Sequence, residues 1–215
     1  MKLSVTFPRE RQPTETECRL LEAALEVFAE KGLHGATTQE IGNLAGVGKS
    51  TLHYYFRHKD ELYARVFEDA FVKMAGPLGE RLKPGQGLRE TIDGLVGYQV
   101  RAYHEKPAMV RLWMQENMIG APVAVPMLHR LNALPNSPYR IFIENLQLAI
   151  DSGESRPADP LQTFVTAMGA SLFLPIAQAS MVATLEDHGS PDLEAFVDKR
   201  ADEIVEMMYR GLRAD

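Results

Sequence analysis

Apolar residues recur at helical spacing along almost the whole of this 215-residue chain. In the first such segment, Leu21, Ala24, Leu25 and Phe28 follow the i, i+3, i+4, i+7 pattern that gathers apolar side chains on one helix face. Alternation of apolar and polar residues with period two, which is typical of a half-buried strand, does not persist anywhere. The sequence therefore predicts an all-α fold of about nine or ten helices.

Glycine and proline residues divide this pattern into separate helices. Gly32 follows the first apolar stripe, Gly76-Pro77 interrupts the fourth, and residues 84–87 read Pro-Gly-Gln-Gly, which is a loop sequence. The predicted helices span residues 14–32, 37–45, 48–55, 59–75, 88–104, 107–119, 126–131, 137–151, 161–186 and 191–212.

The second of these helices opens with a capping box. Thr37 is followed three residues later by Glu40, so each side chain can accept from a backbone N–H group of the other. We expect Ile41, Leu44 and Ala45 to form the buried face of this short helix.

A glycine turn follows. Gly46 permits it because a residue without Cβ tolerates positive φ, and a third helix then begins near Gly48. Two short helices joined in this way behind a longer supporting helix form a helix-turn-helix. We therefore expect a flexible tail over residues 1–13, a helix-turn-helix domain over 14–62 and a larger helical domain over 63–215.

Local charge supports DNA binding by this segment. The formal net charge of the chain is −6, yet no Asp or Glu occurs between Ile41 and Lys59. Phosphate binding requires a local basic face rather than a basic protein. Five residues form such a stripe, namely Lys49, Arg57 and Lys59 with His53 and His58.

The third helix carries hydrogen-bond donors suited to DNA. Gly48 and Lys49 lie at its N-terminus, where free N–H groups can face a phosphate or a base edge. Lys49 can donate to guanine, and Ser50 and Thr51 can donate to bases or phosphates.

The same helix has an apolar side that fixes which residues face outward. Leu52 and Phe56, four residues apart, would anchor its inner face. That register turns His53 and Tyr54 outward, toward a DNA groove.

Residues 48–50 read Gly-Lys-Ser and so imitate a nucleotide-binding loop. The full pattern requires a glycine where Asn43 stands, and such a loop follows a strand rather than a helix. A P-loop-like enzyme is therefore a remote alternative. A single cysteine and scattered histidines offer neither a disulfide nor metal-ligand spacing, so we expect no cofactor, no metal and no catalytic residue.

From Leu20 to Phe67 the chain resembles the DNA-binding domain of TetR-type transcriptional regulators. The resemblance rests on residues 37–41 (TTQEI), 45–47 (AGV), 51–52 (TL), 54–56 (YYF) and 59–62 (KDEL). It implies that Thr38, Tyr55 and Lys59 touch phosphate. It also implies that the groove is occupied by Lys49, Ser50, Thr51, His53 and Tyr54.

Three positions depart from the usual family pattern. Gly48 replaces a capping serine, Ser50 replaces a glycine and His53 replaces a tyrosine. Glycine caps a helix almost as well as serine, so folding should tolerate the first change. The other two changes leave the base preference open.

The resemblance further implies a ligand-binding C-terminal region whose last two helices form a dimer interface. The predicted helix over residues 107–119 is apolar over most of its girth, which is typical of a buried helix or of one that lines a cavity. Methionine and aromatic side chains suit an adaptable apolar pocket. The predicted ligand contacts are Tyr103, Met109, Arg111, Trp113, Met114, Glu116, Asn117 and Met118.

The last predicted helix places Leu193, Val197, Ile204 and Met208 on one stripe. Such a stripe can pack inside one subunit or form a four-helix interface with a second copy, and we take it as the dimer interface. Residues 161–185 carry no charge, but their Thr, Ser, Pro and Gln content favours a buried helix over a membrane span.

Together these features predict a cytoplasmic homodimer that represses transcription and leaves a palindromic operator when a small, hydrophobic or aromatic effector binds. A DNA-bound interaction or architectural factor without a ligand is the alternative. Neither hypothesis requires a membrane or a cofactor.

Overall fold

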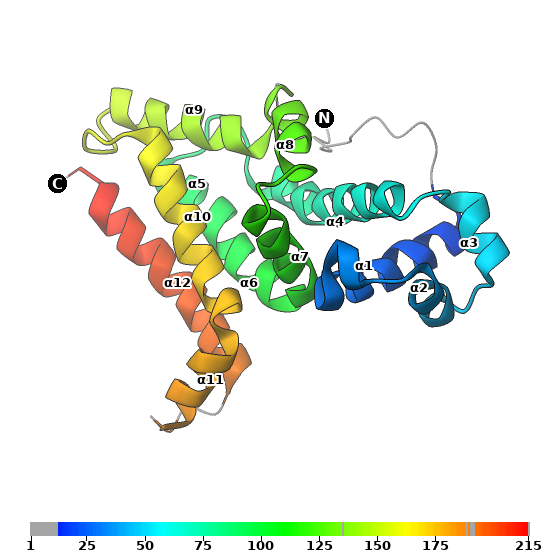
Figure 1. Ribbon diagram of the computed structural model, residues 1–215. Helices are drawn as coiled ribbons and strands as arrows, with labels where there is room; N and C mark the ends of the chain where they lie inside the picture. Colours follow the sequence, from blue (N-terminus) through cyan, green and yellow to red (C-terminus); the bar gives the residue numbers. More distant parts are fainter. Residues whose placement is uncertain (1–12, 135, 188, 190–191, 215) are drawn as a thin grey trace. The chain divides into compact units, whose positions relative to one another are not determined.

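The computed structural model describes residues 13–134, 136–187, 189 and 192–214 (Figure 1). Within these residues the elements are twelve α-helices and one π-helix, so the predicted all-α fold is confirmed. The number exceeds the expected nine or ten because two predicted helices are divided. The predicted flexible tail, residues 1–13, lies outside the described residues apart from Pro13.

The chain forms two compact units, and each is described by itself. One unit contains described residues 13–74 and 108–131, and the other contains 75–107 with the described residues from 132 onward. Residues 108–131 therefore group with the N-terminal helices, although they lie well beyond the predicted domain boundary after residue 62. Periodicity defines a helix and its apolar face but does not identify the neighbour that covers that face. The functional boundary at residue 62 remains a prediction.

The N-terminal unit holds the helix-turn-helix. Thr14 caps its first helix by accepting from the Glu17 N–H group at 3.2 Å, and Gly32 interrupts the regular helix with a φ of 69°. The helices of this unit are α1 (Glu15–Gly35), α2 (Thr38–Ala45), α3 (Lys49–Tyr55), most of α4 (Lys59–Arg81), α7 (Pro107–Met118) and most of α8 (Ala124–Asn132).

The predicted capping box and turn of α2 are confirmed. Thr37 Oγ1 accepts from the Glu40 N–H group at 3.2 Å, and Glu40 Oε2 accepts from the Thr37 N–H group at 3.1 Å. Gly46 ends the helix in the left-handed conformation, with a φ of 67°. The sequence of residues 37–46 therefore determines this part of the fold locally.

In contrast, two local predictions about α2 and α4 are wrong. Leu44 is 60% exposed, because Ile41 and its neighbours take the buried side of α2 and leave Leu44 outside it. The expected interruption of the fourth helix is also absent, since α4 continues through Pro77 to Arg81. Proline removes one backbone hydrogen bond, but Leu78 immediately after it is buried in a core cluster that holds the last turn of α4 in place.

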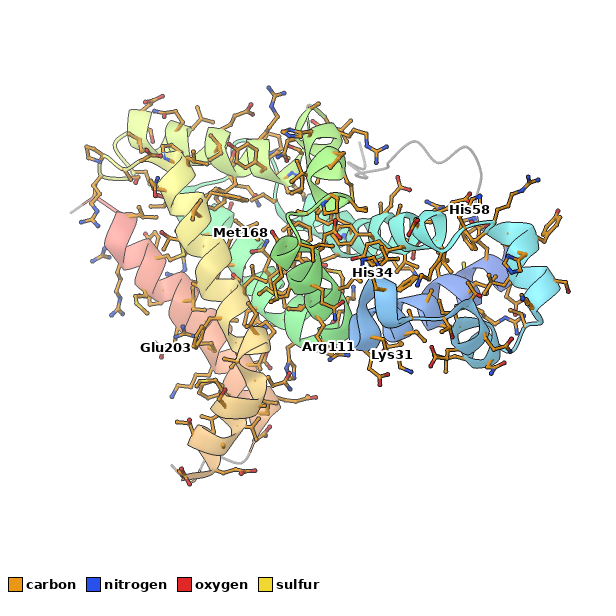
Figure 2. All side chains as sticks on the ribbon, in the orientation of Figure 1. Lys31, His34, His58, Arg111, Met168 and Glu203 are labelled. Atoms are coloured by element: carbon orange, nitrogen blue, oxygen red, sulfur yellow. The ribbon has the colours of Figure 1, made fainter. Side chains whose placement is uncertain are left out.

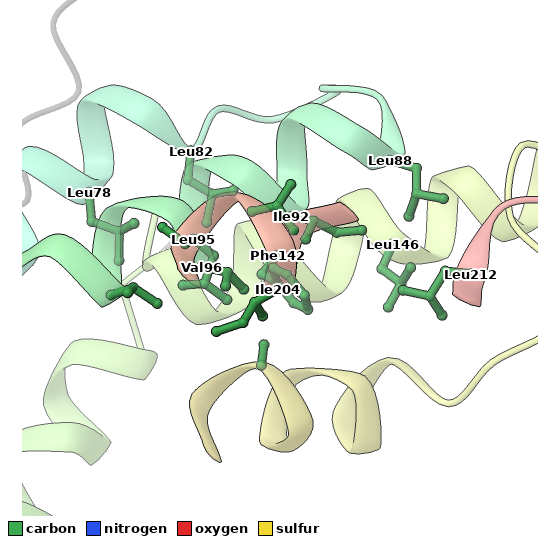
Figure 3. Packing of buried hydrophobic residues seen from close by; sticks show 14 of the residues in the cluster. Leu78, Leu82, Leu88, Ile92, Leu95, Val96, Phe142, Leu146, Ile204 and Leu212 are labelled. Carbon is green, nitrogen blue, oxygen red and sulfur yellow. The ribbon is translucent and has the colours of Figure 1, made fainter. Parts of the chain in front are cut away.

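The second unit, here called the C-terminal unit, has its core between seven helical segments and the end of α4. Figure 3 shows Leu82, Ile92, Phe142 and Ile204 meeting in this core. Its elements are α5 (Leu88–Ile92), the π-helix η1 (Asp93–Gly97), α6 (Tyr98–Glu105), α9 (Pro138–Asp151), α10 (Pro160–Ile176), α11 (Gln178–Asp187) and α12 (Leu193–Leu212).

The helix expected over residues 161–186 is divided into α10 and α11, which meet at an angle of 73°. Pro175 lies just before the bend and cannot donate to the carbonyl one turn earlier, which explains why the helix breaks there. No single helix in the described residues is both long and apolar enough to cross a membrane, and the bent pair reaches that length only when its two halves are counted together.

The stripe predicted as the dimer interface packs on the core of its own subunit, and its role in a dimer interface stays a prediction. Val197 and Ile204 are 3% and 2% exposed, and Leu193 and Met208 pack half-buried against the same cluster. The internal packing that the sequence also allowed is present in the subunit. The apolar side chains of α10 that stay exposed are Leu161, Val165, Phe173 and Ile176.

Candidate nucleic-acid interface

Close contact between α2 and the turn that follows it sets the position of α3. A Cβ atom on Gly42 would lie 3.1 Å from the Val47 carbonyl oxygen, so any residue with a side chain would be tightly packed here and glycine fits without a shift. Leu52 and Phe56 are 1% and 6% exposed, which confirms that they anchor α3. The rest of α3 is thereby presented to the outside.

The side chains predicted to read DNA lie on that outer side. Thr38 of α2 is half-buried, as are Thr51 and Tyr55 of α3, and Tyr54 is 82% exposed. The remaining predicted groove residues of α3 and its cap are all exposed, namely Gly48, Lys49, Ser50 and His53.

Tyr55 is held by a residue from the start of α1. Thr14 Oγ1 donates to Tyr55 Oη at 3.0 Å, and the rings of Tyr54 and Tyr55 meet edge to face with centroids 5.2 Å apart. Because Tyr55 Oη acts as the acceptor in this bond, its own hydrogen is available to a further acceptor. A phosphate oxygen is such an acceptor.

Lys59 has a structural role that the sequence did not indicate. Its ammonium group donates to the carbonyl oxygens of His34 and Ala36 at 3.3 and 2.9 Å. These two carbonyls belong to the end of α1 and to the connection with α2, so Lys59 ties α4 to the first part of the helix-turn-helix. An ammonium group has three donors, and one is left for the predicted phosphate contact.

Glu40, the acid that directly precedes the acid-free segment, is neutralised locally. Its carboxylate accepts from Lys31 Nζ and from the Thr37 hydroxyl. The hydrogen bond from Lys31, followed by those from Thr37, lowers the pKa of Glu40 below its ordinary value. The carboxylate therefore stays charged and bound to Lys31 rather than opposing a phosphate.

Two of the predicted ligand contacts pack among aromatic rings of the N-terminal unit. Met109 and Trp113 face Phe67 and Phe71, and Trp113 lies 5.6 Å from Phe67 between ring centroids. The cavity among these rings has a volume of about 10 Å³, which is the space of a single water molecule. Packing of the N-terminal unit therefore explains both residues.

The polar and terminal residues of α7 lie elsewhere. Arg111, labelled in Figure 2, is exposed, as is Asn117, and Met118 is 82% exposed. Met114 is half-buried. Tyr103 is 3% exposed and belongs to α6 of the C-terminal unit.

Glu116 is fully buried and already engaged by protein donors. Its Oε2 atom accepts from the Tyr63 hydroxyl at 2.9 Å, and its Oε1 atom accepts from the N–H groups of Val123 and Ala124. Burial, and then the hydrogen bond to Glu116, raise the pKa of Tyr63 well above its ordinary value. We therefore regard Glu116 as a structural residue that joins α4, α7 and α8, and no longer as a ligand contact.

The roles of two residues, Thr14 and Gln99, were not predicted from the sequence. Thr14 was identified only as a helix start, since its partner lies 41 positions away. Gln99, an amide among the buried residues of α6, was overlooked, although an uncharged polar residue one turn before Tyr103 is a signal visible in the sequence.

Two short helices are joined by a glycine turn, and the second helix exposes hydrogen-bond donors while Leu52 and Phe56 anchor its inner side. This is the helix-turn-helix arrangement of DNA-binding proteins. Residues 20–66 match the family described as bacterial regulatory proteins, tetR family. The regulator RutR of Escherichia coli K12 is 28% identical over 220 residues, which cover 98% of this chain and 97% of that protein. Residues 20–66 thus match the DNA-binding region of the tetR family, and the chain is similar over almost its whole length to a TetR-type transcriptional regulator, a class of proteins that are not enzymes.

Other relatives support the same assignment. The repressor KstR2 of Mycolicibacterium smegmatis is 23% identical over 146 residues, or 68% of this chain and 70% of that protein. A tetR-family protein from Rhodococcus RHA1 has a TM-score of 0.74 at 17% identity, over 94% of this chain and all of the other. The ketosteroid regulator KstR2 of Mycobacterium tuberculosis has a TM-score of 0.71 at 16% identity, over 95% and 98%. These structures share the fold.

Proposed function

We propose that this regulator is a dimeric, cytoplasmic repressor that binds a palindromic operator and leaves it when a small, largely apolar effector binds. The observation that carries the DNA-binding half is the outer side of α3, where exposed donors stand on an inner side held by Leu52 and Phe56. Recognition helices of this kind enter the major groove.

Within this site, the proposed roles divide into base readout and phosphate binding. Lys49, Ser50 and His53, all exposed, would face base edges together with Gly48, Thr51 and Tyr54. Thr38, Tyr55 and Lys59 would bind phosphates and so fix the register on the duplex.

The proposed dimer interface is the exposed apolar stripe of α10. Leu161, Val165 and Phe173 are 49%, 56% and 57% exposed, and they recur at intervals of four or eight residues, so they lie on one helix face. An exposed apolar stripe of this kind marks a protein interface. Pairing with the same stripe of a second copy is an isologous contact and matches a palindromic operator.

Support for an effector is less direct. The regulator with the similar fold from Mycobacterium tuberculosis is named for ketosteroids, which are apolar molecules with few polar groups. A ligand that favours one spacing of the two recognition helices changes operator affinity by its differential binding to the two states.

The DNA-binding proposal is tested by gel shift with fragments from the region upstream of the protein's own gene. Binding should weaken steeply with salt, because each phosphate contact releases counterions. Lys49→Ala should relax the preference at one operator position by about 1–3 kcal/mol. Failure to bind any palindromic fragment from that region contradicts the proposal.

One observation favours the alternative of a DNA-bound interaction factor without an effector. The aromatic cluster around Trp113 encloses only about 10 Å³, so this side of α7 offers no room for a ligand. Operator binding that no small molecule changes, together with capture of a protein partner, would select that alternative.

A further inference from the structure

The amide of Gln99 is the least satisfied polar group of the C-terminal unit. Gln99 lies in α6 and is 6% exposed. Among the described residues, its Oε1 atom has no hydrogen-bond partner. Its Nε2 atom donates to Met168 Sδ of α10 at 3.2 Å, and a thioether is a weak acceptor. Folded proteins pair more than about nine in ten buried polar groups, so this amide requires an explanation.

The other buried polar side chains of the same unit have partners. Asn145 donates to the Lys83 carbonyl at 2.8 Å and to Thr91 Oγ1 at 3.1 Å, and it accepts from the Gly85 N–H group at 2.7 Å. Ser171 donates to the carbonyl one turn earlier in its own helix, at 2.8 Å. Gln99 thus differs from Asn145 and Ser171, whose buried side chains are paired with strong donors or acceptors.

A second polar group lies beside Gln99. Tyr103 follows four residues later, so both side chains project from the same face of α6. Its side chain is 3% exposed. Burial raises the pKa of this phenol well above its ordinary value, so the group stays neutral and keeps its hydrogen.

The helix that carries these two residues is irregular just before them. η1 covers Asp93–Gly97 and runs directly into α6. Single π-turns inside α-helices occur frequently at functional sites, since they shift the residues that follow around the helix axis. The π-turn therefore sets the direction in which Gln99 and Tyr103 project.

The surroundings determine the charge of a possible ligand. The buried charged side chains among the described residues are Glu17, Asp69 and Glu116, and all three belong to the N-terminal unit. No described charged side chain is buried in the C-terminal unit, so a charged ligand would lack a counterion there. Met168, labelled in Figure 2, is half-buried and unbranched, which makes it an adaptable wall.

We propose that Gln99 and Tyr103 form the effector subsite, and that the effector is a neutral, mostly apolar molecule whose N–H group donates to Gln99 Oε1. The hydroxyl of Tyr103 makes the second polar contact, and Met168 covers the apolar part. This inference rests on the proposed ligand-responsive function and names the residues and the chemistry behind it.

The test uses pairs of small probes in which N-methylation replaces the N–H donor by a methyl group. Benzamide and 2-pyrrolidone carry N–H groups, and N,N-dimethylbenzamide and N-methyl-2-pyrrolidone do not. The full-length protein is labelled at its methionine methyl groups, and the Met168 signal is assigned with Met168→Leu. At millimolar concentration the N–H probes should shift this signal, and the methylated probes should bind at least about tenfold more weakly.

Two variants complete the design. Gln99→Met removes the acceptor with little change of volume and should abolish the preference for N–H probes while operator binding is unchanged. Gln115→Met is the matched control, because Gln115 also has a buried carbonyl oxygen without a described partner but lies in the N-terminal unit, with its Nε2 atom bonded to the Ala29 carbonyl at 2.9 Å. It should leave the preference intact.

Several results would overturn the inference. These are an equal response to methylated and unmethylated probes, no shift of the Met168 signal with any probe, or an unchanged preference in Gln99→Met. A larger fall in melting temperature for Gln99→Met than for Gln115→Met would mean that water or protein already satisfies the amide, and would also overturn it. If the unaltered protein does not bind an operator at all, the proposed function is contradicted instead. A failure of the effector subsite and a failure of the proposed function are therefore distinguishable.

Discussion

Thr14 Oγ1 donates to Tyr55 Oη at 3.0 Å and joins the start of α1 to the end of α3. The same Thr14 oxygen accepts from the Glu17 N–H group at 3.2 Å, so one hydroxyl caps a helix and orients a phenol. The phenol keeps its own hydrogen for a third group. This geometry makes Tyr55 a prepared donor to a phosphate, with Thr14 as its positioning residue.

Removing either hydroxyl should therefore weaken operator binding. Tyr55→Phe should reduce the free energy of operator binding by about 1.5 kcal/mol, the lower end of the range for a hydrogen bond to a charged acceptor. The salt dependence should stay unchanged, because a neutral donor releases no counterion. Fluorescence anisotropy at several salt concentrations measures both quantities.

Thr14→Val should lose part of the same operator affinity. Thr14→Ser should keep the affinity of the unaltered protein, because serine both caps the helix and donates a hydrogen bond. In the Tyr55→Phe background, Thr14→Val should have no further effect on affinity. An additive effect would mean that Thr14 acts on the helix alone and would contradict its positioning role.

The helix-turn-helix could be predicted because its signals are local. The capping box of Thr37 and Glu40, the positive φ of Gly46 and the inner residues Leu52 and Phe56 all lie within a few residues of the elements they shape. The bond between Thr14 and Tyr55 could not be predicted, since periodicity does not state how distant segments meet. The same reason explains why the burial of Leu44 was misjudged.

Lys59 should affect folding as well as DNA binding. Lys59→Met removes the donor to the His34 and Ala36 carbonyls and should lower the free energy of unfolding by about 1 kcal/mol. If its remaining hydrogen reaches a phosphate, the salt slope of operator binding falls by about one unit. Lys49→Ala is the control, because Lys49 is exposed and should change base preference without changing stability. Urea unfolding of both variants gives the comparison, and equal stabilities would refute the structural role of Lys59.

The contact between Lys31 and Glu40 should be visible in acid unfolding. The pKa of Glu40 is lowered in the folded protein, first by Lys31 and then by Thr37, so its contribution is present above the ordinary glutamate pKa. This contribution is lost as the pH falls through the lower folded value. The melting temperature of Glu40→Gln should therefore fall below that of the unaltered protein at neutral pH, and the difference should close below about pH 4. Glu26→Gln, at an exposed position of α1, should show no such convergence.

Glu116 should be among the most sensitive residues of the N-terminal unit. Glu116→Ala leaves the donors of Tyr63, Val123 and Ala124 unsatisfied in a buried site, and we expect a loss on the order of 3 kcal/mol. Tyr63→Phe removes one of these bonds and should cost about 1 kcal/mol. Asn117→Ala, at the exposed next position, should stay within about 0.5 kcal/mol of the unaltered protein. Similar losses in Glu116→Ala and Asn117→Ala, measured by urea unfolding, would refute this role.

Sequence patterns predicted an apolar α7 and an apolar stripe on α12, and both exist, but their partners differ from those expected. Trp113 packs on Phe67 and Phe71, and Val197 and Ile204 pack in the core of the same subunit. An apolar stripe looks the same in sequence whether a ligand, a second subunit or the chain itself covers it. Whether an apolar stripe belongs to an interface therefore becomes visible only from how far its side chains are exposed in the single subunit.

Those fractions lead to the prediction for α10. Phe173 is 57% exposed and Val165 is 56% exposed, so a charge at either position costs a single subunit little and costs a buried interface much. Val165→Glu and Phe173→Glu should shift the protein from dimer to monomer in sedimentation and should weaken binding to a palindromic operator far more than to a half-site. Gln162→Glu places the same charge on an exposed polar position of α10 and is the control. Dimers that survive both charged substitutions would mean that another face of the C-terminal unit joins the two copies.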